Sequence, residues 1–353
     1  MCLHPSQVCD DIPQCPQQDD EVLCQSPCPQ HCHCQGLSWV CDKKIDPQYF
    51  RTNTSGDIQE NRIPVSSQPR YLDASHSGVD FSDVVALNML VRLRLSHCDI
   101  NNVSFSSHTS STPSENNELI FPNLQYIDLS HNDIESVDLV DFLFLINLRV
   151  LILAHNPISQ IINSAEFSTN VESVGDLNGI NNMQAASNTT ITSIISISDT
   201  VTFPKSSETL QLLDLSFTNF KLLNTLYLQS FPELRVFNIS YSKVSTISTE
   251  GFKPIPMLER FYAKNTPLVR FPTDVLKPLD HLKSLTSENY KLCCPAFLPD
   301  DFDVNNCEAT QDLLASCEDL LKSTYYRVFL WVFAALSLLG NITSFVARLY
   351  LDR

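Results

Sequence analysis

Thirteen cysteines give this 353-residue chain its most evident chemistry, because thiols either form disulfides or bind zinc. Eight lie between Cys2 and Cys41, four lie between Cys293 and Cys317, and Cys98 stands alone. Dense clusters on either side of a long cysteine-poor stretch favour disulfide-stapled end modules in an oxidising compartment. Zinc binding is the alternative that the residue types allow.

The chain is also acidic, with a formal net charge of −17. Its first 42 residues hold no Lys or Arg and six acids, which are Asp10, Asp11, Asp19, Asp20, Glu21 and Asp42. Such a surface repels nucleic acid and favours cations or basic peptides, unless the acidity only keeps an extracellular protein soluble. No P-loop, G-x-S-x-G or H-E-x-x-H motif is present, so we do not expect an enzyme.

The elements that position these residues follow a repeated pattern, L-x-x-L-x-L-x-x-N-x-L. Eight copies begin at Pro69, Leu90, Leu124, Leu148, Leu210, Leu234, Leu258 and Leu282. Each copy predicts one short strand, and stacking the copies buries their leucines in one continuous core. We therefore expect a leucine-rich-repeat solenoid over residues 63–292, with a curved parallel β-sheet and an irregular or helical convex side.

Two intervals between repeats are longer than the usual step of 24 residues. A polar insertion near 104–117 is expected to form a surface loop. A second insertion, near 163–208, holds either one or two decayed repeats or an extruded loop. The sequence leaves this choice open.

The third and fifth positions of each copy flank a buried leucine and point outward on the concave face, because side chains alternate along a strand. We expect a protein ligand to contact the aromatic and charged residues there, which are Tyr71, Asp73, Arg92, Arg94, Tyr126, Asp128, Asp214, Arg260 and Tyr262. The acids in this set favour a basic ligand. Asp is also a common residue at this position of the repeat, which is the alternative explanation.

The eighth position of the repeat holds His76, His97, His131 and His155. A metal ladder or a pH sensor is one interpretation. Histidine after serine is frequent in this repeat, so surface residues without either role are the expectation. Cys98 takes the Asn position and is expected to be a buried free thiol.

Four sequons predict glycosylation at Asn53, Asn102, Asn188 and Asn238. Asn238 lies on the concave face, so a glycan there would block part of that face.

Residues 328–347 carry no charge and are bounded by Arg327 and Arg348. They predict a transmembrane helix over 325–348 with a cytoplasmic stub at 349–353, so the chain lies in the plasma membrane with its N-terminus outside. Asn341 within the span is costly unless another helix or water satisfies its amide. No signal peptide is visible, so we expect the true N-terminus to be missing.

Residues 1–24 carry the spacing C-x6-C-x5-C-x8-C and resemble the second half of an LDL-receptor class A module. The resemblance implies a Cys9–Cys24 disulfide and a structural calcium ion. The implied calcium ligands are the side chains of Asp10, Gln14, Asp20 and Glu21 and the carbonyls of Gln7 and Ile12. Gln14 stands where the family usually has Asp, and an acidic disulfide loop without metal is the alternative.

Residues 25–62 resemble the cysteine-rich N-terminal cap of extracellular leucine-rich-repeat proteins. The family pairing would be Cys28–Cys34 and Cys32–Cys41. Residues 293–324 resemble a cysteine-rich hinge, in which Cys293 or Cys294 pairs with Cys307 and Cys317. Family precedent favours Cys294–Cys317, which leaves Cys293–Cys307.

Taken together, these segments resemble leucine-rich-repeat G-protein-coupled receptors, notably relaxin-family peptide receptors and a snail receptor with class A modules. Gly340-Asn341 is similar to a pair in the first helix of rhodopsin-like receptors. The resemblance implies a receptor fragment, truncated at both ends, for a peptide or protein hormone. A heterotrimeric G protein would be a partner only of the full-length protein, and a single-span adhesion or matrix-binding protein is the alternative.

Overall fold

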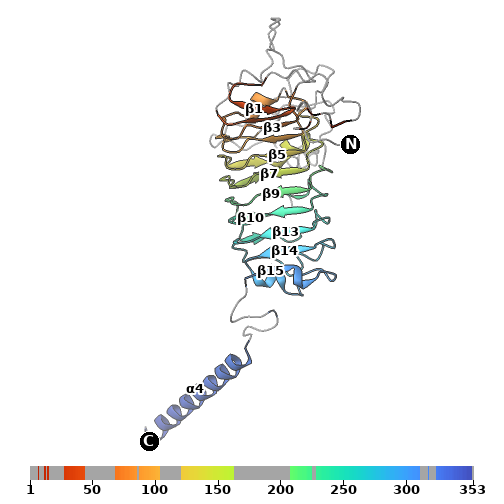
Figure 1. The fold of residues 1–353 in the computed structure, drawn as a ribbon. Coiled ribbons are helices and arrows are strands. Elements are labelled where there is room, and N and C mark those ends of the chain that lie inside the picture. Colours follow the sequence, from red (N-terminus) through yellow and green to blue (C-terminus); the bar gives the residue numbers. More distant parts are fainter. Residues whose placement is uncertain are drawn as a thin grey trace, which may run out of the picture.

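The computed structural model describes residues 28–43, 68–85, 87–103, 121–162, 207–224, 228–310 and 323–351, together with Gln7, Ile12, Gln14, Cys15 and Cys317. Figure 1 shows a long stack of short strands, with a separate helix near the C-terminal end of the chain. Five of the site residues predicted for the class A module lie outside the described part, which are Cys9, Asp10, Asp20, Glu21 and Cys24. The calcium site and the Cys9–Cys24 disulfide therefore stay predictions, as do the sequons at Asn53 and Asn188.

An eleven-stranded sheet runs the length of the stack. In spatial order its strands are β1 (Cys32–Gln35), β2 (Ser38–Cys41), β3 (Tyr71–Asp73), β4 (Arg92–Arg94), β5 (Tyr126–Asp128), β7 (Val150–Ile152), β9 (Leu212–Asp214), β11 (Val236–Asn238), β13 (Arg260–Ala263), β14 (Ser284–Ser287) and β15 (Cys307–Ala309). β1 and β2 are antiparallel, and every other pair of neighbours is parallel. The predicted leucine-rich-repeat solenoid is confirmed, because each of the eight sequence copies supplies one strand of this sheet.

The core follows directly from the repeat. The central residue of each repeat strand is completely buried, and the eight are Leu72, Leu93, Ile127, Leu151, Leu213, Phe237, Phe261 and Leu285. Burying one such side chain contributes about 1.5–3 kcal/mol. The stacked copies thereby form one apolar cluster that extends from Trp39 in β2 to Phe302 beyond the last repeat.

Polar groups at the ninth position close the turn that follows each strand. Asn132 accepts a hydrogen bond from the Cys98 amide at 2.8 Å and donates to the Leu95 carbonyl at 2.7 Å. Asn156 donates to the Leu129 carbonyl at 2.9 Å, one repeat further along. Cys98 takes the same position as a buried free thiol, as expected, and its Sγ donates to the Ala74 carbonyl. These bonds satisfy backbone groups that burial would otherwise leave unpaired.

The opposite side of the solenoid has short, varied elements. Two small parallel sheets pair β6 (Ser136–Asp138) with β8 (Gln160–Ile162), and β10 (Leu222–Leu223) with β12 (Thr246–Ile247). Helix α1 (Phe81–Val84) and the 3-10 helix η6 (Leu139–Phe144) lie in the connections of other repeats. This agrees with the irregular or helical convex side that the sequence predicts.

The main sheet is continuous across both long intervals between repeats. β4 pairs directly with β5, and β7 pairs directly with β9 through Val150 opposite Leu212. The predicted insertion near 104–117 lies outside the described residues, and so does the one near 163–208 except for residues 207 and 208. The choice between decayed repeats and an extruded loop therefore stays open.

Disulfide-bonded caps cover both ends of the core. At the N-terminal end, the hairpin of β1 and β2 carries the Cys28–Cys34 and Cys32–Cys41 bonds and buries Trp39 against the first repeat. At the C-terminal end, the 3-10 helices η7 (Tyr290–Cys293) and η8 (Val304–Asn306) precede β15. The bonds there are Cys293–Cys307 and Cys294–Cys317. All four are pairs that the family resemblance implies.

Helix α4 (Thr324–Leu351) is long and apolar enough to cross a membrane, by length and composition. None of its apolar stretch is buried in the protein. At 1.5 Å per residue, 28 residues extend about 42 Å, against about 30 Å for the hydrocarbon of a bilayer. The helix includes the predicted span and exposes Asn341 on its surface.

Candidate ligand-binding surface

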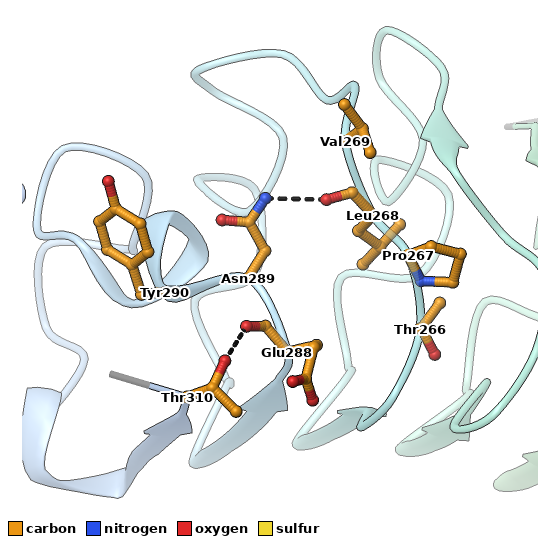
Figure 2. A pocket seen from close by; sticks show the side chains of 8 residues that line it. All are labelled: Thr266, Pro267, Leu268, Val269, Glu288, Asn289, Tyr290 and Thr310. Atoms are coloured by element: carbon orange, nitrogen blue, oxygen red, sulfur yellow. Dashed lines mark hydrogen bonds between the residues drawn. The ribbon is translucent and has the colours of Figure 1, made fainter. Parts of the chain in front are cut away.

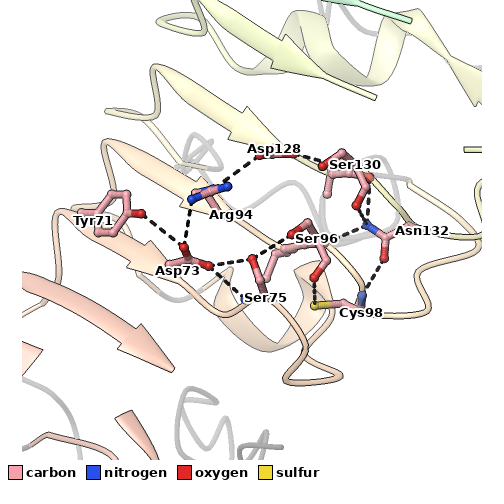
Figure 3. Close-up of polar contacts among 11 residues, drawn as sticks. Tyr71, Asp73, Ser75, Arg94, Ser96, Cys98, Asp128, Ser130 and Asn132 are labelled. Carbon is pink, nitrogen blue, oxygen red and sulfur yellow. Dashed lines mark hydrogen bonds and ion pairs between the residues drawn. The ribbon is translucent and has the colours of Figure 1, made fainter. Parts of the chain in front are cut away.

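The outward surface of the eleven-stranded sheet, which we call the sheet face, carries six polar and aromatic side chains in register at its N-terminal end. Tyr71, Arg92 and Tyr126 stand opposite one another in β3, β4 and β5. Two residues further along the same strands, Asp73, Arg94 and Asp128 form a second row. Figure 3 shows Arg94 between the two acids of its row, with Tyr71 beside Asp73. We call these six residues the charged grid.

Arg94 is the central link of the charged grid. Its Nη1 lies 3.2 Å from Asp73 Oδ2 and its Nε lies 3.4 Å from Asp128 Oδ2. The Tyr71 hydroxyl and then the Asp73 and Asp128 carboxylates raise the pKa of the Arg94 guanidinium, while partial burial opposes this shift. Because the Arg94 side chain is still 41% exposed, water screens these ion pairs. Arg94 nonetheless holds two neighbouring carboxylates together.

Arg92 packs on an aromatic ring in the other row. Its guanidinium carbon lies 4.7 Å from the centroid of the Tyr126 ring, a cation–π contact that contributes about 0.5–1 kcal/mol at an exposed site. Burial, followed by the charge of Asp128, raises the pKa of the Tyr126 hydroxyl. Arg92 itself is exposed, so its donors are available to a partner.

The acids of the second row also have a structural role. In each of Asp73, Asp128 and Asp214, one carboxylate oxygen accepts a hydrogen bond from the backbone amide two residues later. The three donor–acceptor distances are 3.1, 3.0 and 2.9 Å. Asn238 does the same with Ser240 at 3.0 Å. This turn-closing bond explains why acids and Asn recur at the fifth position. Arg94 also pairs with both Asp73 and Asp128, which weakens the argument for a basic ligand at this end.

The centre of the sheet face is apolar, which the sequence prediction missed. Four of its six outward residues in β7, β9 and β11 are partly exposed aliphatic side chains, namely Val150, Ile152, Leu212 and Val236; the other two are Asp214 and Asn238. We call the four aliphatic residues the apolar patch. The signal was present, because apolar residues fill the third position of three successive copies. An apolar centre beside polar flanks is the usual anatomy of a protein-binding surface.

The C-terminal end of the sheet face is polar again. Arg260 and Tyr262 stand in register with Ser284 and Thr286 of β14, and Arg260 is exposed. These residues are separated from the charged grid by the apolar patch, so the predicted site residues form two groups on one face. Asp214 lies between them and accepts a hydrogen bond from Asn238 Nδ2 at 3.1 Å.

That bond bears on the predicted glycan at Asn238. The nitrogen that would carry the sugar is engaged with Asp214, and the Asn238 oxygen is engaged with Ser240. The Asn238 side chain is also only partly exposed within β11. These contacts argue against glycosylation at Asn238, whereas Asn102 is exposed.

A cavity of about 390 Å³ opens between the last repeats and the C-terminal cap. Figure 2 shows its lining, which consists of Thr266, Pro267, Leu268, Val269, Glu288, Asn289, Tyr290 and Thr310. The Asn289 amide donates to the Leu268 carbonyl at 2.8 Å, and the Thr310 hydroxyl donates to the Glu288 carbonyl. Val269 is 73% exposed beside it, an unusual value for an aliphatic side chain. The cavity is a second place where a partner's side chain would fit.

Metal binding finds no support in this part of the molecule. Among the described residues, no three His, Cys, Asp or Glu side chains converge as metal ligands. The four histidines at the eighth position instead stack ring against ring at the edge of the sheet face. The structure thus gives the metal-ladder interpretation no geometric basis.

The chain is similar to one family model and to several solved structures. A family model described as a leucine-rich repeat matches residues 122–142. Among solved structures, the chain is similar to that of a TLR13–ssRNA13 complex, with 19% identity, a TM-score of 0.45, and coverage of 63% of this chain and 25% of that one. An internalin, inlF, from Listeria monocytogenes has 13% identity and a TM-score of 0.40, with coverage of 70% and 50%. The mouse RP105/MD-1 complex has 15% identity and a TM-score of 0.42, with coverage of 63% and 32%.

The chain thus spans between a quarter and half of those longer chains. No curated protein sequence matches it. The eight stacked copies and the continuous sheet show the fold, and the matched family model agrees with it. The chain folds as a leucine-rich-repeat solenoid with disulfide-bonded caps at both ends and a long apolar C-terminal helix.

Proposed function

We propose that this chain is the extracellular, ligand-binding region of a membrane receptor, with the sheet face as its capture surface. The observation that supports this most strongly is the sequence of surfaces along one rigid sheet. The charged grid, the apolar patch and the polar end at β13 and β14 follow one another without interruption. Disulfide-bonded caps suit the oxidising space outside the cell, and α4 would anchor the solenoid in the bilayer.

The ligand that fits this face is a peptide or small protein. It would place apolar side chains on the patch around Ile152 and Leu212, because burying aliphatic area there supplies most of the binding energy. It would place an acidic or carbonyl group beside Arg92, whose donors are exposed. Asp214, which has no ion pair within the described residues, remains an acceptor for a basic group.

The finer hypothesis is a G-protein-coupled receptor for a peptide or protein hormone. It is supported by the resemblance of the class A spacing, the cysteine pairs and Gly340-Asn341 to that family. In this hypothesis the Asn341 amide bonds to further transmembrane helices of the complete receptor. The second candidate, a single-span adhesion protein, is favoured by the one apolar helix found among the described residues. A transcript that encodes further apolar spans after Arg353 would favour the receptor, and one with a short polar tail would favour adhesion.

The capture surface is tested with the whole chain displayed on cells. Displayed wild-type chain is incubated with fractionated peptides from the same organism, and the peptides it retains are identified by mass spectrometry. Each retained peptide is then synthesised and titrated against variants. We expect Ile152→Lys to weaken binding at least about tenfold, because a charge would be forced into an apolar contact.

The matched control is Lys253→Ala, on the connection between β12 and β13, whose Nζ bonds only the exposed Glu250. It should leave binding unchanged. Equal affinity of the wild type and the Ile152→Lys variant for every retained peptide would refute the sheet face as the capture surface.

A further inference from the structure

Six rings form a continuous stack along one edge of the sheet face, at the eighth position of six successive repeats. They are His76, His97, His131, His155, Phe217 and Tyr241, and we call them the ring row. Successive ring centroids lie 4.3, 4.4, 4.1, 3.9 and 4.4 Å apart, with the rings nearly parallel. All six side chains are exposed. The sequence shows the histidines but not that their rings touch.

The backbone beneath the ring row is unusual and shared. Each of the six residues has a positive φ, between 56° and 62°, which is costly for a residue with a side chain. The amide of each residue donates to a carbonyl of the next repeat. For example, His131 donates to Ala154 at 3.0 Å and His155 donates to Ser216 at 2.9 Å. The rings therefore sit directly on the turns that join neighbouring repeats.

Four titratable rings in contact cannot all become charged cheaply, because each imidazolium would repel its neighbours at about 4 Å. Loss of hydration, followed by the charges of His131 and His76, lowers the pKa of His97 below its ordinary value of 6.5. Loss of hydration and then the charge of His155 lower the pKa of His131. The Asp128 carboxylate opposes both shifts.

Two further carboxylates lie on the same turns as His97 and His131. They belong to Asp99 and Asp133, which lie two residues after these histidines and are both exposed. His155 stacks on the uncharged ring of Phe217. The stack is therefore favoured when the imidazoles are neutral, and the apolar half of the ring row is indifferent to protons.

We propose that the histidine half of the ring row is an acid-operated switch, which is stacked and closed at neutral pH and unstacks when the compartment is acidified. Linkage gives the direction of this pH dependence. A histidine ring binds protons more readily outside the stack than within it, so adding protons favours the unstacked state. The closed state is fully favoured above pH 6.5 and is lost as the pH falls through the lowered values. Opening releases strained turns at the edge of the sheet face.

The switch connects with ligand binding through Asp128. Its Oδ2 pairs with Arg94 and its Oδ1 closes the turn at Ser130, next to His131. Charging His97 and His131 draws Asp128 toward the ring row and away from Arg94. This consequence rests on the proposed function, and it predicts that acid weakens ligand binding at the charged grid. The switch itself is a property of the chain without ligand.

The test is hydrogen exchange of the ligand-free whole chain in detergent micelles at pH 7.4 and 5.5, corrected for the intrinsic pH dependence of exchange. Protection of the His97, His131 and His155 amides should fall roughly fivefold or more at pH 5.5, the effect of one adjacent pair of like charges in water. The Phe217 and Tyr241 amides make the same type of bond, at 2.9 and 2.7 Å, and serve as the internal control. Their protection should not change.

A variant separates titration from stacking. His97→Phe with His131→Phe keeps rings in the row, and Phe217 shows that the turn accepts phenylalanine. We expect this variant to lose the acid response at the three amides. NMR titration of ring carbons in the wild type needs no substitution, and should show a lowered pKa for His97 and His131.

Two results would overturn the proposal: equal loss of protection in both halves of the ring row, or a pKa of His97 and His131 that is not lowered from its ordinary value. Failure of the proposed function would look different. In that case the exchange response would persist, while no peptide would bind the sheet face at either pH.

Discussion

Replacement of Arg94 by methionine is the sharpest test of the charged grid, because one side chain holds two carboxylates. The Asp128 side chain is only 7% exposed and that of Asp73 is 15% exposed, whereas Arg94 is 41% exposed. Fully exposed pairs contribute about 0–1 kcal/mol, and breaking a buried pair costs about 3–5 kcal/mol. The ion pairs of Arg94 are partly screened by water, so their contribution lies between these two ranges. We therefore expect Arg94→Met to lower the local free energy of unfolding by about 1–2 kcal/mol at pH 7.4.

The assay is hydrogen exchange of the strands β3, β4 and β5, because a solenoid opens locally and a single global free energy of unfolding is poorly defined. Arg260→Met is the matched control, since Arg260 has the same type of location on β13 but no ion pair among the described residues. It should cost under about 0.5 kcal/mol. Combining Arg94→Met with Asp128→Asn should cost less than the sum of the two single changes, with a coupling of about 1 kcal/mol. Equal costs for the two arginine variants, with no coupling, would refute the reasoning.

Three further predictions test the core, the C-terminal cap and the glycans. Leu213→Ala should cost about 2–5 kcal/mol in local hydrogen exchange around β9, because it leaves a cavity in a fully buried site, whereas Leu222→Ala at a 43% exposed site should cost under about 1 kcal/mol. Cys294→Ser opens a bond that closes a separation of 23 residues and should destabilise the hinge by about 3 kcal/mol, seen as faster proteolysis, while Cys98→Ala should leave hinge proteolysis unchanged. Peptide mapping of chain secreted from animal cells should find sugar on Asn102 and none on Asn238; a fully occupied Asn238 would contradict the bonding of its amide to Asp214.

The sequence predicts the solenoid well because the repeat states the core directly. Leucines at fixed spacing have one way to be buried together, and that arrangement fixes both strand position and register. The same repeat does not predict the contacts within the candidate site, because it fixes the buried positions and leaves the outward positions unspecified. Arg94 bonds acids 21 and 34 residues away, and the larger separation depends on an insertion whose path the repeat does not specify. Stacking of the ring row likewise needs six positive φ angles, which no spacing of histidines reveals.

Register also decides how function arises on this fold. A repeat strand of three residues contributes only two outward side chains, too few to recognise a ligand alone. The sheet aligns them in rows, and in several places a member contacts the next repeat. Arg94 lies between two acids in one row. His131 lies in the same way between two histidines in another row. In the proposed switch, Asp128 links the two rows, because its carboxylate pairs with Arg94 and its charge acts on His97 and His131. We therefore expect acid to change ligand recognition at β4 and β5. We expect recognition at β13 to be independent of acid, because Arg260 and Tyr262 face the same side but lie beyond the apolar patch.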